Sequence, residues 1–153
     1  MRPLTRLALF LCTVAFLTTG PVVARASAAA PGPEITVFKD PNCGCCSNWV
    51  AYLRKHGYRV VVHDTSDLDG IKRTAGITDD LASCHTAFVN GYVIEGHVPV
   101  EDIDRLLREK PKVAGLAVPG MPSGSPGMEG GTPQHYVVVA FMRAGGKQVF
   151  ARH

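Results

Sequence analysis

The sequence contains no acidic residue before Glu34 and no apolar run long enough for a comfortable membrane span. The segment before Glu34 instead begins with Arg2 and Arg6, continues with an apolar core from about Leu7 to Leu17, and ends in small residues that include Ala-x-Ala sites. This arrangement is typical of a secretory signal peptide. We therefore predict a signal peptide over residues 1–28, cleaved near 26–28, a linker over 29–33, and one folded domain over 34–153.

An excess of charge is also absent once this leader is set aside. The leader holds three of the 16 basic residues and none of the 13 acidic ones, so the rest of the chain carries 13 of each. A net charge near zero gives no support to binding of nucleic acid or of an anionic membrane. Secretion would place the remaining four cysteines outside the cytosol, where disulfides can persist.

Two further classes of protein find no support in the sequence. No internal repeat occurs at the periods of solenoids or propellers. Asp64, Asp67 and Asp69 form a small carboxylate cluster, but the EF-hand pattern is missing and aspartates are expected in such a turn. We therefore assign no chemistry to these aspartates.

The chain does contain a regular succession of strand-like and helix-like segments. Runs of β-branched and aromatic residues predict strands, and apolar residues three or four apart predict helices. The predicted elements are a strand at 34–40, a helix at 46–56, a strand at 58–64, a helical segment at 65–77, a hairpin of 86–89 and 92–95 around Asn90-Gly91, and a helix at 98–110. A Gly/Pro/Met-rich loop at 114–134 and a C-terminal β-hairpin around Gly145-Gly146 should follow.

The order β-α-β-α-β-β-α predicts an α/β domain of thioredoxin-like architecture. That fold holds its reactive cysteines at the first strand-to-helix turn. Here this turn carries Cys43-Gly44-Cys45-Cys46, three thiols in four positions. A helix N-terminus favours negative charge, so it suits a nucleophilic or metal-binding thiolate. In the same fold, Cys84 should pass beside the turn as the chain enters the hairpin, so that four sulfurs would share one pocket.

Three kinds of site compete for these cysteines. A mononuclear zinc site is disfavoured, because it usually takes its cysteines as separated pairs and the adjacent Cys45 and Cys46 cannot easily reach one ion. Sulfurs shared among several Cu(I) ions would use the third thiol, and thiolates and thioethers select Cu(I). One alternative is a pair of structural disulfides, in which a Cys43–Cys46 bridge would leave Cys45 and Cys84 to pair. The other is a thiol–disulfide oxidoreductase using Cys43 and Cys46.

Other sulfur and nitrogen ligands are weaker candidates. Met121 and Met128 could cap a Cu(I) site from the loop or pack as gap-fillers. His85 and His97 each carry an imidazole that could bind a metal. Neighbouring side chains on a strand face opposite ways, so His85 could point away from Cys84. We expect His85, and still more His97, to be structural or surface residues.

With these residues assembled, the chain resembles the CopG-like proteins, which are thioredoxin-fold copper-binding proteins of bacterial copper-resistance clusters. The resemblance covers residues from about Ile35 to Glu129 and is carried by "FKDPNCGCCSNWVAYL", "SCHTAFVNGYVIEGHVPVEDIDRLL" and "GLAVPGMPSGSPGME". It implies a periplasmic protein that binds copper through Cys43, Cys45, Cys46 and Cys84 as a multinuclear cluster. It further implies a copper-handling or copper-redox factor, with copper ions and other periplasmic copper-handling proteins as partners, and not an enzyme with an organic substrate.

Overall fold

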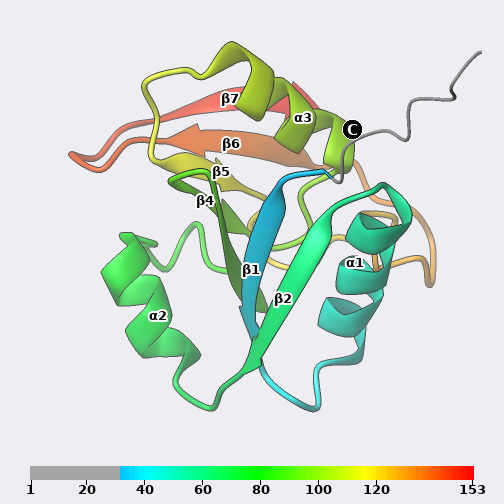
Figure 1. The fold of residues 1–153 in the computed structure, drawn as a ribbon. Helices are drawn as coiled ribbons and strands as arrows, with labels where there is room; N and C mark the ends of the chain where they lie inside the picture. Colours follow the sequence, from blue (N-terminus) through cyan, green and yellow to red (C-terminus); the bar gives the residue numbers. More distant parts are fainter. Residues whose placement is uncertain (1–31) are drawn as a thin grey trace, which may run out of the picture.

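A computed structural model describes residues 32–153, so the predicted signal peptide and most of the linker lie outside the described residues. The described chain forms three helices and a seven-stranded sheet (Figure 1). Its elements are β1 Glu34–Lys39, α1 Gly44–Lys55, β2 Arg59–Asp64, α2 Leu68–Ala75, β3 His85–Val89, β4 Tyr92–Glu95, α3 Val100–Glu109, β5 Gly115–Ala117, β6 Val137–Phe141 and β7 Lys147–Arg152.

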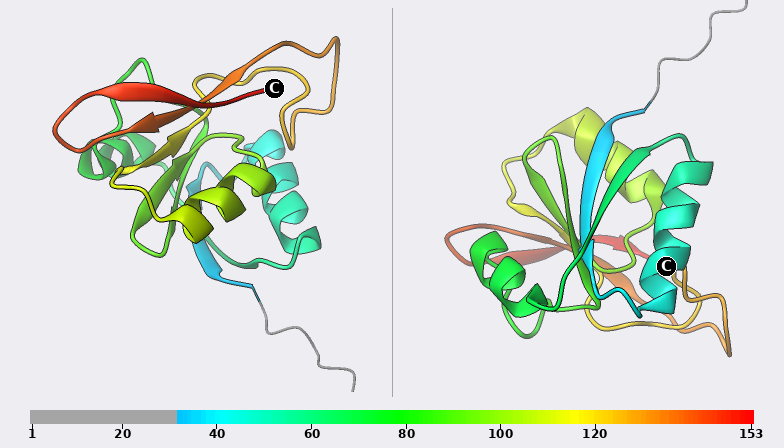
Figure 2. Two further views of the ribbon diagram at one scale, coloured as in Figure 1. Left: turned by 90° about the horizontal axis from the view of Figure 1, so that it is seen from above. Right: turned by 60° about the horizontal axis from the view of Figure 1, so that its bottom comes forward.

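One continuous sheet organises the domain, with strand order β2-β1-β3-β4-β5-β6-β7. The pairs β1–β2 and β4–β5 are parallel, and the other four pairs are antiparallel. Helices α1 and α3 cover one face and α2 covers the other, as the two views of Figure 2 show. The element order up to α3 is the predicted one, and the fold is a single mixed α/β domain.

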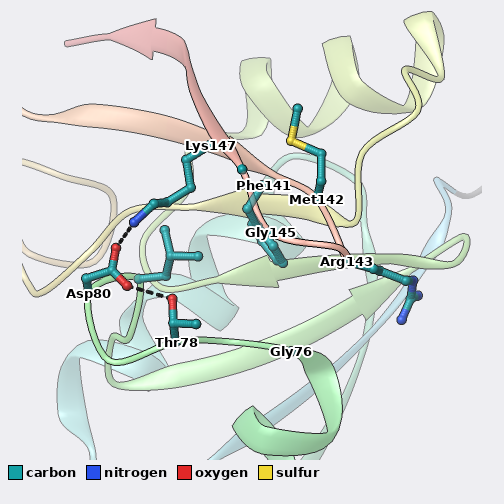
Figure 3. A pocket seen from close by; sticks show the side chains of 10 residues that line it. Gly76, Thr78, Asp80, Phe141, Met142, Arg143, Gly145 and Lys147 are labelled. Carbon is teal, nitrogen blue, oxygen red and sulfur yellow. Dashed lines mark hydrogen bonds and ion pairs between the residues drawn. The ribbon is translucent and has the colours of Figure 1, made fainter.

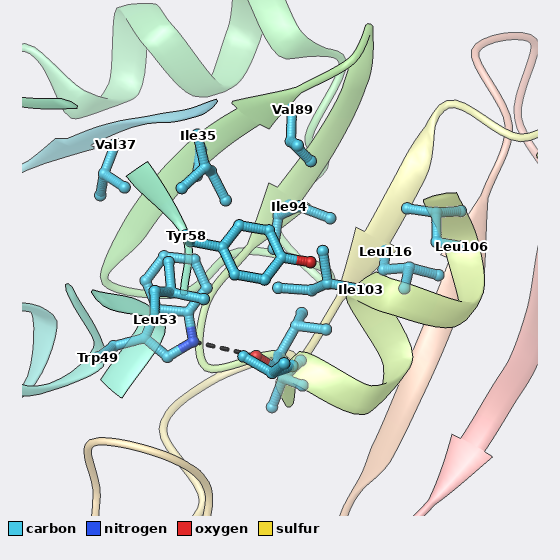
Figure 4. Close-up of a cluster of buried hydrophobic side chains, with 14 of the residues drawn as sticks. Ile35, Val37, Trp49, Leu53, Tyr58, Val89, Ile94, Ile103, Leu106 and Leu116 are labelled. Atoms are coloured by element: carbon cyan, nitrogen blue, oxygen red, sulfur yellow. Dashed lines mark hydrogen bonds between the residues drawn. The ribbon is translucent and has the colours of Figure 1, made fainter. Parts of the chain in front are cut away.

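The larger hydrophobic core lies between the sheet and helices α1 and α3 (Figure 4). Trp49 of α1 is fully buried there with Ile35 of β1 and Ile103 of α3. The Trp49 indole also donates a hydrogen bond of 3.0 Å to the backbone oxygen of Val98. This hydrogen bond links α1, which carries cysteines at its N-terminal end, to the segment between β4 and α3. The same buried side chain therefore packs in the core and positions that segment.

A smaller core lies on the opposite face, under α2. It joins Ala75 and Leu81 to Phe141 of β6. The two cores explain why the central strands are buried on both faces. Strand β3, which follows Cys84, has four of its five residues buried or nearly so.

Two boundaries differ from the predictions. Helix α1 begins at Gly44, two residues before the predicted start, because the Cys43 side chain caps it by accepting a hydrogen bond from the Cys46 backbone N–H. Part of the predicted loop at 114–134 forms the short strand β5. A Cβ atom at Gly115 would lie against the Val93 backbone, so this three-residue strand depends on a close approach to β4 that strand propensity does not reveal.

No helix within residues 32–153 has both the length and the apolar character needed to cross a membrane. A cavity of about 200 Å³ lies beside the β6–β7 turn (Figure 3). Its rim carries an ion pair between Lys147 and Asp80, and the Thr78 hydroxyl also donates to Asp80. This turn and the N-terminal end of α1 lie on opposite sides of the domain (Figure 1), so the cavity is remote from the cysteines.

Candidate metal centre

Four cysteine sulfurs meet at the N-terminal end of α1. Cys43 is the N-cap residue, Cys45 and Cys46 lie in the first turn, and Cys84 comes from the segment that enters β3. All four sulfurs lie within 4.8 Å of one another. The Cys45 sulfur is 3.4 Å from that of Cys43 and 3.8 Å from that of Cys84. The predicted approach of Cys84 to the turn is thus observed in the structure.

The four sulfurs are not chemically equivalent. Cys43 and Cys46 form a disulfide, whereas Cys45 and Cys84 are free thiols. The sequence left open a second bridge between Cys45 and Cys84, and this bridge is absent. Burial, followed by the neighbouring Cys45, raises the pKa of the Cys84 thiol to about 12. A bound cation would oppose both effects, because it favours the thiolate.

Two buried imidazoles face the Cys84 sulfur. His97 Nε2 lies 3.0 Å from it and His85 Nδ1 lies 3.3 Å from it. Both histidines have no exposed surface. Burial lowers the pKa of His97 below its usual range, and burial with the nearby His97 and Lys72 lowers the pKa of His85 well below it. Both rings are therefore neutral near pH 7, the form that binds metals.

The hydrogen bonds of the two rings differ. His97 Nδ1 lies 2.8 Å from the Pro126 backbone oxygen, so this nitrogen carries the proton and Nε2 presents its lone pair toward Cys84. His85 packs against Trp49, and its Nε2 is the buried side-chain nitrogen without a hydrogen-bond partner among the described residues. These features suit a centre whose ligands are sulfur and neutral nitrogen.

A buried carboxylate holds the segment that carries Cys84. Glu95 Oε1 accepts hydrogen bonds from the Ser83 backbone N–H at 2.7 Å and from Lys72 at 2.5 Å, and Glu95 Oε2 accepts one from Thr86 at 2.7 Å. Burial raises the pKa of Glu95, and Lys72 opposes that shift. Since Ser83 and Thr86 flank Cys84 and His85, this network fixes the backbone of both candidate ligands.

The glycine at position 96 brings a second segment close to Cys84. Gly96 has a φ of 71°, and a Cβ atom there would meet the Ser83 side chain and the Val118 carbonyl. Only glycine combines this backbone conformation with such a close approach. This close approach of the Gly96 backbone places His97 at the centre, directly after the end of β4.

The loop between β5 and β6 packs on helix α1 beside the centre at one turn. A Cβ atom at Gly127 would lie 2.8 Å from both the backbone oxygen of Cys45 and the backbone nitrogen of Trp49, so this turn packs directly on α1. Met128 follows this turn and is half-buried, whereas Met121 lies earlier in the loop and is 54% exposed.

The structure thus brings together the four predicted cysteines and His85. The expectation that His85 and His97 could be surface residues is wrong, because both are fully buried beside Cys84. The concern that His85 points away is also wrong, because the bend before β3 lets both neighbouring side chains reach the same site. A histidine directly after a glycine was the one sequence feature that could have drawn attention to His97.

Comparison with known proteins identifies the family. Residues 81–128 match the family model described as "Protein of unknown function, DUF411". A solved structure named "Copper resistance protein copG- Form 2" is 43% identical, with a TM-score of 0.76, and the match covers 79% of this chain and 98% of that one. Form 1 of that protein is also 43% identical, with a TM-score of 0.75, and the match covers 80% of this chain and 98% of that one.

The chain belongs to the CopG-like family. No curated protein matches the sequence. The match to the family model spans residues 81–128, so in this CopG-like chain it includes Cys84, His85, His97 and the Gly127 turn, but not Cys43, Cys45 or Cys46. The likeness to the copper resistance structures and the cysteine cluster together support a copper-related function.

Proposed function

We propose that this protein binds Cu(I) at a multinuclear site formed by Cys43, Cys45, Cys46 and Cys84, with all four present as thiolates. The observation that carries the proposal is the convergence of four sulfurs within 4.8 Å of one another. Soft thiolates favour Cu(I), and adjacent cysteines suit ions that share sulfurs. Such a protein would sequester, transfer or redox-handle copper in copper resistance.

Three other side chains extend this proposed ligand set. His85 offers its Nδ1, 3.3 Å from the Cys84 sulfur. Met121 and Met128 would act from the loop, as thioethers that cap the site or guide ions toward it. The Gly127 turn supports this role, because the loop that carries both methionines packs on the cysteine-bearing helix.

We also propose that the protein works in the periplasm after cleavage of a signal peptide near residues 26–28. The basic and apolar pattern of residues 1–28 motivates this proposal. Copper ions, and other periplasmic copper-handling proteins, would be its partners. Mass spectrometry of the protein secreted to the periplasm would locate the new N-terminus.

Metal content and free thiols, counted together, test the proposed site. Protein reduced and reconstituted anaerobically with Cu(I) should hold more than one copper per chain and protect its thiols from alkylation. Parallel samples with Zn(II) or no metal provide the reference. Absence of tight copper would reject the proposal.

The variant Cys45→Ser should bind at least one copper fewer per chain while retaining the fold. Cys45 is the central sulfur, 3.4 Å from Cys43 and 3.8 Å from Cys84, so its loss removes shared contacts. Ser47→Ala changes an exposed residue of the same helical turn and should leave the stoichiometry unchanged. Equal copper in Cys45→Ser and the parent protein would exclude the shared cluster.

A thiol–disulfide oxidoreductase is the second candidate function, favoured by the Cys43–Cys46 disulfide. In the reduced protein these two thiols would give two electrons and two protons to a substrate disulfide, forming their own disulfide and two substrate thiols. Cys43→Ser or Cys46→Ser should then abolish catalysed disulfide reduction, and Cys45→Ser should spare it. Turnover that persists in Cys46→Ser would exclude this mechanism.

A further inference from the structure

Two groups of candidate ligands overlap at one sulfur. The first contains the four cysteines, and the second contains Cys84, His85 and His97. A metal binds the thiolate form of cysteine, which a disulfide no longer provides. The Cys43–Cys46 disulfide therefore removes two donors from the first group and none from the second.

Cys84 lies beside each of the two other donors that remain, Cys45 and His97. Two thiolates about 2.3 Å from a tetrahedral ion lie about 3.8 Å apart. The Cys45 and Cys84 sulfurs are separated by 3.8 Å. His97 Nε2 lies 3.0 Å from the Cys84 sulfur, but Cys45 and His97 do not belong to one group of donors within 4.8 Å of one another, so binding of all three to one ion requires the His97 ring to move toward Cys45.

A hydrogen bond made by His97, the third donor, sets which of its two ring nitrogens carries the proton. Because His97 Nδ1 donates to the Pro126 carbonyl, the nitrogen facing Cys84 is the unprotonated one. The Pro126 carbonyl belongs to the turn that packs on α1. This carbonyl therefore holds the His97 ring through Nδ1, the nitrogen that does not face Cys84. None of these contacts involves Cys43 or Cys46.

We propose that Cys45, Cys84 and His97 form a one-copper site that persists when Cys43 and Cys46 are joined, so that this disulfide sets the copper capacity of the protein. The inference rests on the proposed function, since the larger capacity belongs to the four-thiolate site. Formation of the disulfide requires a two-electron oxidant of the disulfide class. Cys43 and Cys46 lose two electrons and two protons, and the oxidant is reduced to two thiols.

Anaerobic titration with Cu(I) against a chromophoric competing chelator tests this capacity change. The mature protein is used in its dithiol form and in the form oxidised by glutathione disulfide, with the disulfide verified by mass spectrometry. We expect one Cu(I) per chain in the disulfide form and more than one in the dithiol form. Equal capacities, or no copper in the disulfide form, would overturn the inference.

A redox-inert variant provides an independent measurement. Cys43→Ser/Cys46→Ser cannot form the disulfide and should also bind one Cu(I), with two sulfurs and at least one nitrogen as ligands in X-ray absorption spectra. Adding His97→Gln should weaken this site at least tenfold and lower the nitrogen signal. His135→Gln, at an exposed position, is the matched control and should change neither.

The outcomes separate the two proposals. A dithiol form that binds no copper would reject the proposed function itself. A dithiol form that binds several ions, beside a serine variant that binds none or binds only through sulfur, would reject the smaller site alone. Binding of Zn(II) but not Cu(I) by the serine variant would also reject it.

Discussion

Cys84 is the residue that joins the sulfur and nitrogen sides of the centre. Its sulfur lies 3.8 Å from Cys45 and 3.0 Å from His97. Cys84→Ser would therefore affect both ligand groups, whereas Cys43→Ser would affect only one. The buried Glu95 accepts a hydrogen bond from the Ser83 N–H, so the position of the Cys84 sulfur depends on a residue outside the ligand set.

The two buried histidines should make the stability of the metal-free protein depend on pH. Burial lowers both pKa values, so the unfolded chain binds more protons than the folded one below about pH 6.5. Their contribution to stability is complete above that pH and is lost as the pH falls toward the folded-state values. The loss reaches at most about 1.4 kcal/mol per pH unit for each histidine.

Urea unfolding at pH 7.5 and 5.5 measures this effect. His97→Gln should lower the free energy of unfolding at pH 7.5. Between pH 7.5 and pH 5.5, the free energy of unfolding should then fall less in this variant than in the parent protein. His135→Gln should match the parent at both, because His135 is exposed. If the free energy of unfolding falls by the same amount in His97→Gln as in the parent, His97 does not contribute to the pH dependence.

At the scale of elements, the centre depends on three segments that meet at the start of α1: the cysteine turn, the chain entering and leaving the β3–β4 hairpin, and the loop before β6. The hairpin itself was predictable, because Asn90 and Gly91 both adopt the positive φ values that a tight turn requires. The contact of the loop with α1 was not predictable, because a Gly/Pro-rich sequence does not specify what it packs against.

Gly127→Ala should expose the cysteines. Gly127 has a φ of 87°, and an added Cβ would collide with the Cys45 carbonyl, so the turn should lift from α1 and release His97 from Pro126. We expect a loss of at least about 1–2 kcal/mol of stability from the positive φ alone. Cys45 should also react faster with iodoacetamide.

Gly130→Ala is the matched control in the same loop. A Cβ atom at Gly130 meets no other atom within 4 Å, and its φ is not in the left-handed region. This variant should keep its stability within about 0.5 kcal/mol of the parent. An unchanged alkylation rate in Gly127→Ala would show that the turn does not cover the thiols.

At the scale of the whole molecule, one sheet continues from the cysteine-bearing half into the C-terminal hairpin. Arg105 of α3 ties these parts together, donating to the Phe150 carbonyl at 2.8 Å and to Asp102 at 3.1 Å. Its guanidinium also lies 3.8 Å from the centre of the Phe150 ring. The hairpin is therefore an integral layer of the domain and not an appended tail.

Arg105→Met should lower the free energy of unfolding by about 1–3 kcal/mol, because it removes charged hydrogen bonds and leaves the buried Asp102 with one partner fewer. Arg108→Met, at a side chain that is 67% exposed on the same helix, should change it by less than about 0.5 kcal/mol. Chemical denaturation of the two variants makes the comparison. Equal effects would show that the hairpin does not depend on Arg105.

The amino-acid sequence by itself determined the order of elements, the hairpin turn and the place of the three clustered cysteines. These features are local, because they follow from residue spacing, turn chemistry and the start of one helix. The element order, through the fold that it predicted, also placed Cys84 beside this cluster. Only the tertiary structure decided that His85 and His97 meet Cys84, that Gly115–Ala117 forms a strand, and that the Gly127 turn packs on α1. Each of these depends on contacts between distant segments, and packing and close backbone approach determine such contacts beyond the preferences of any short stretch.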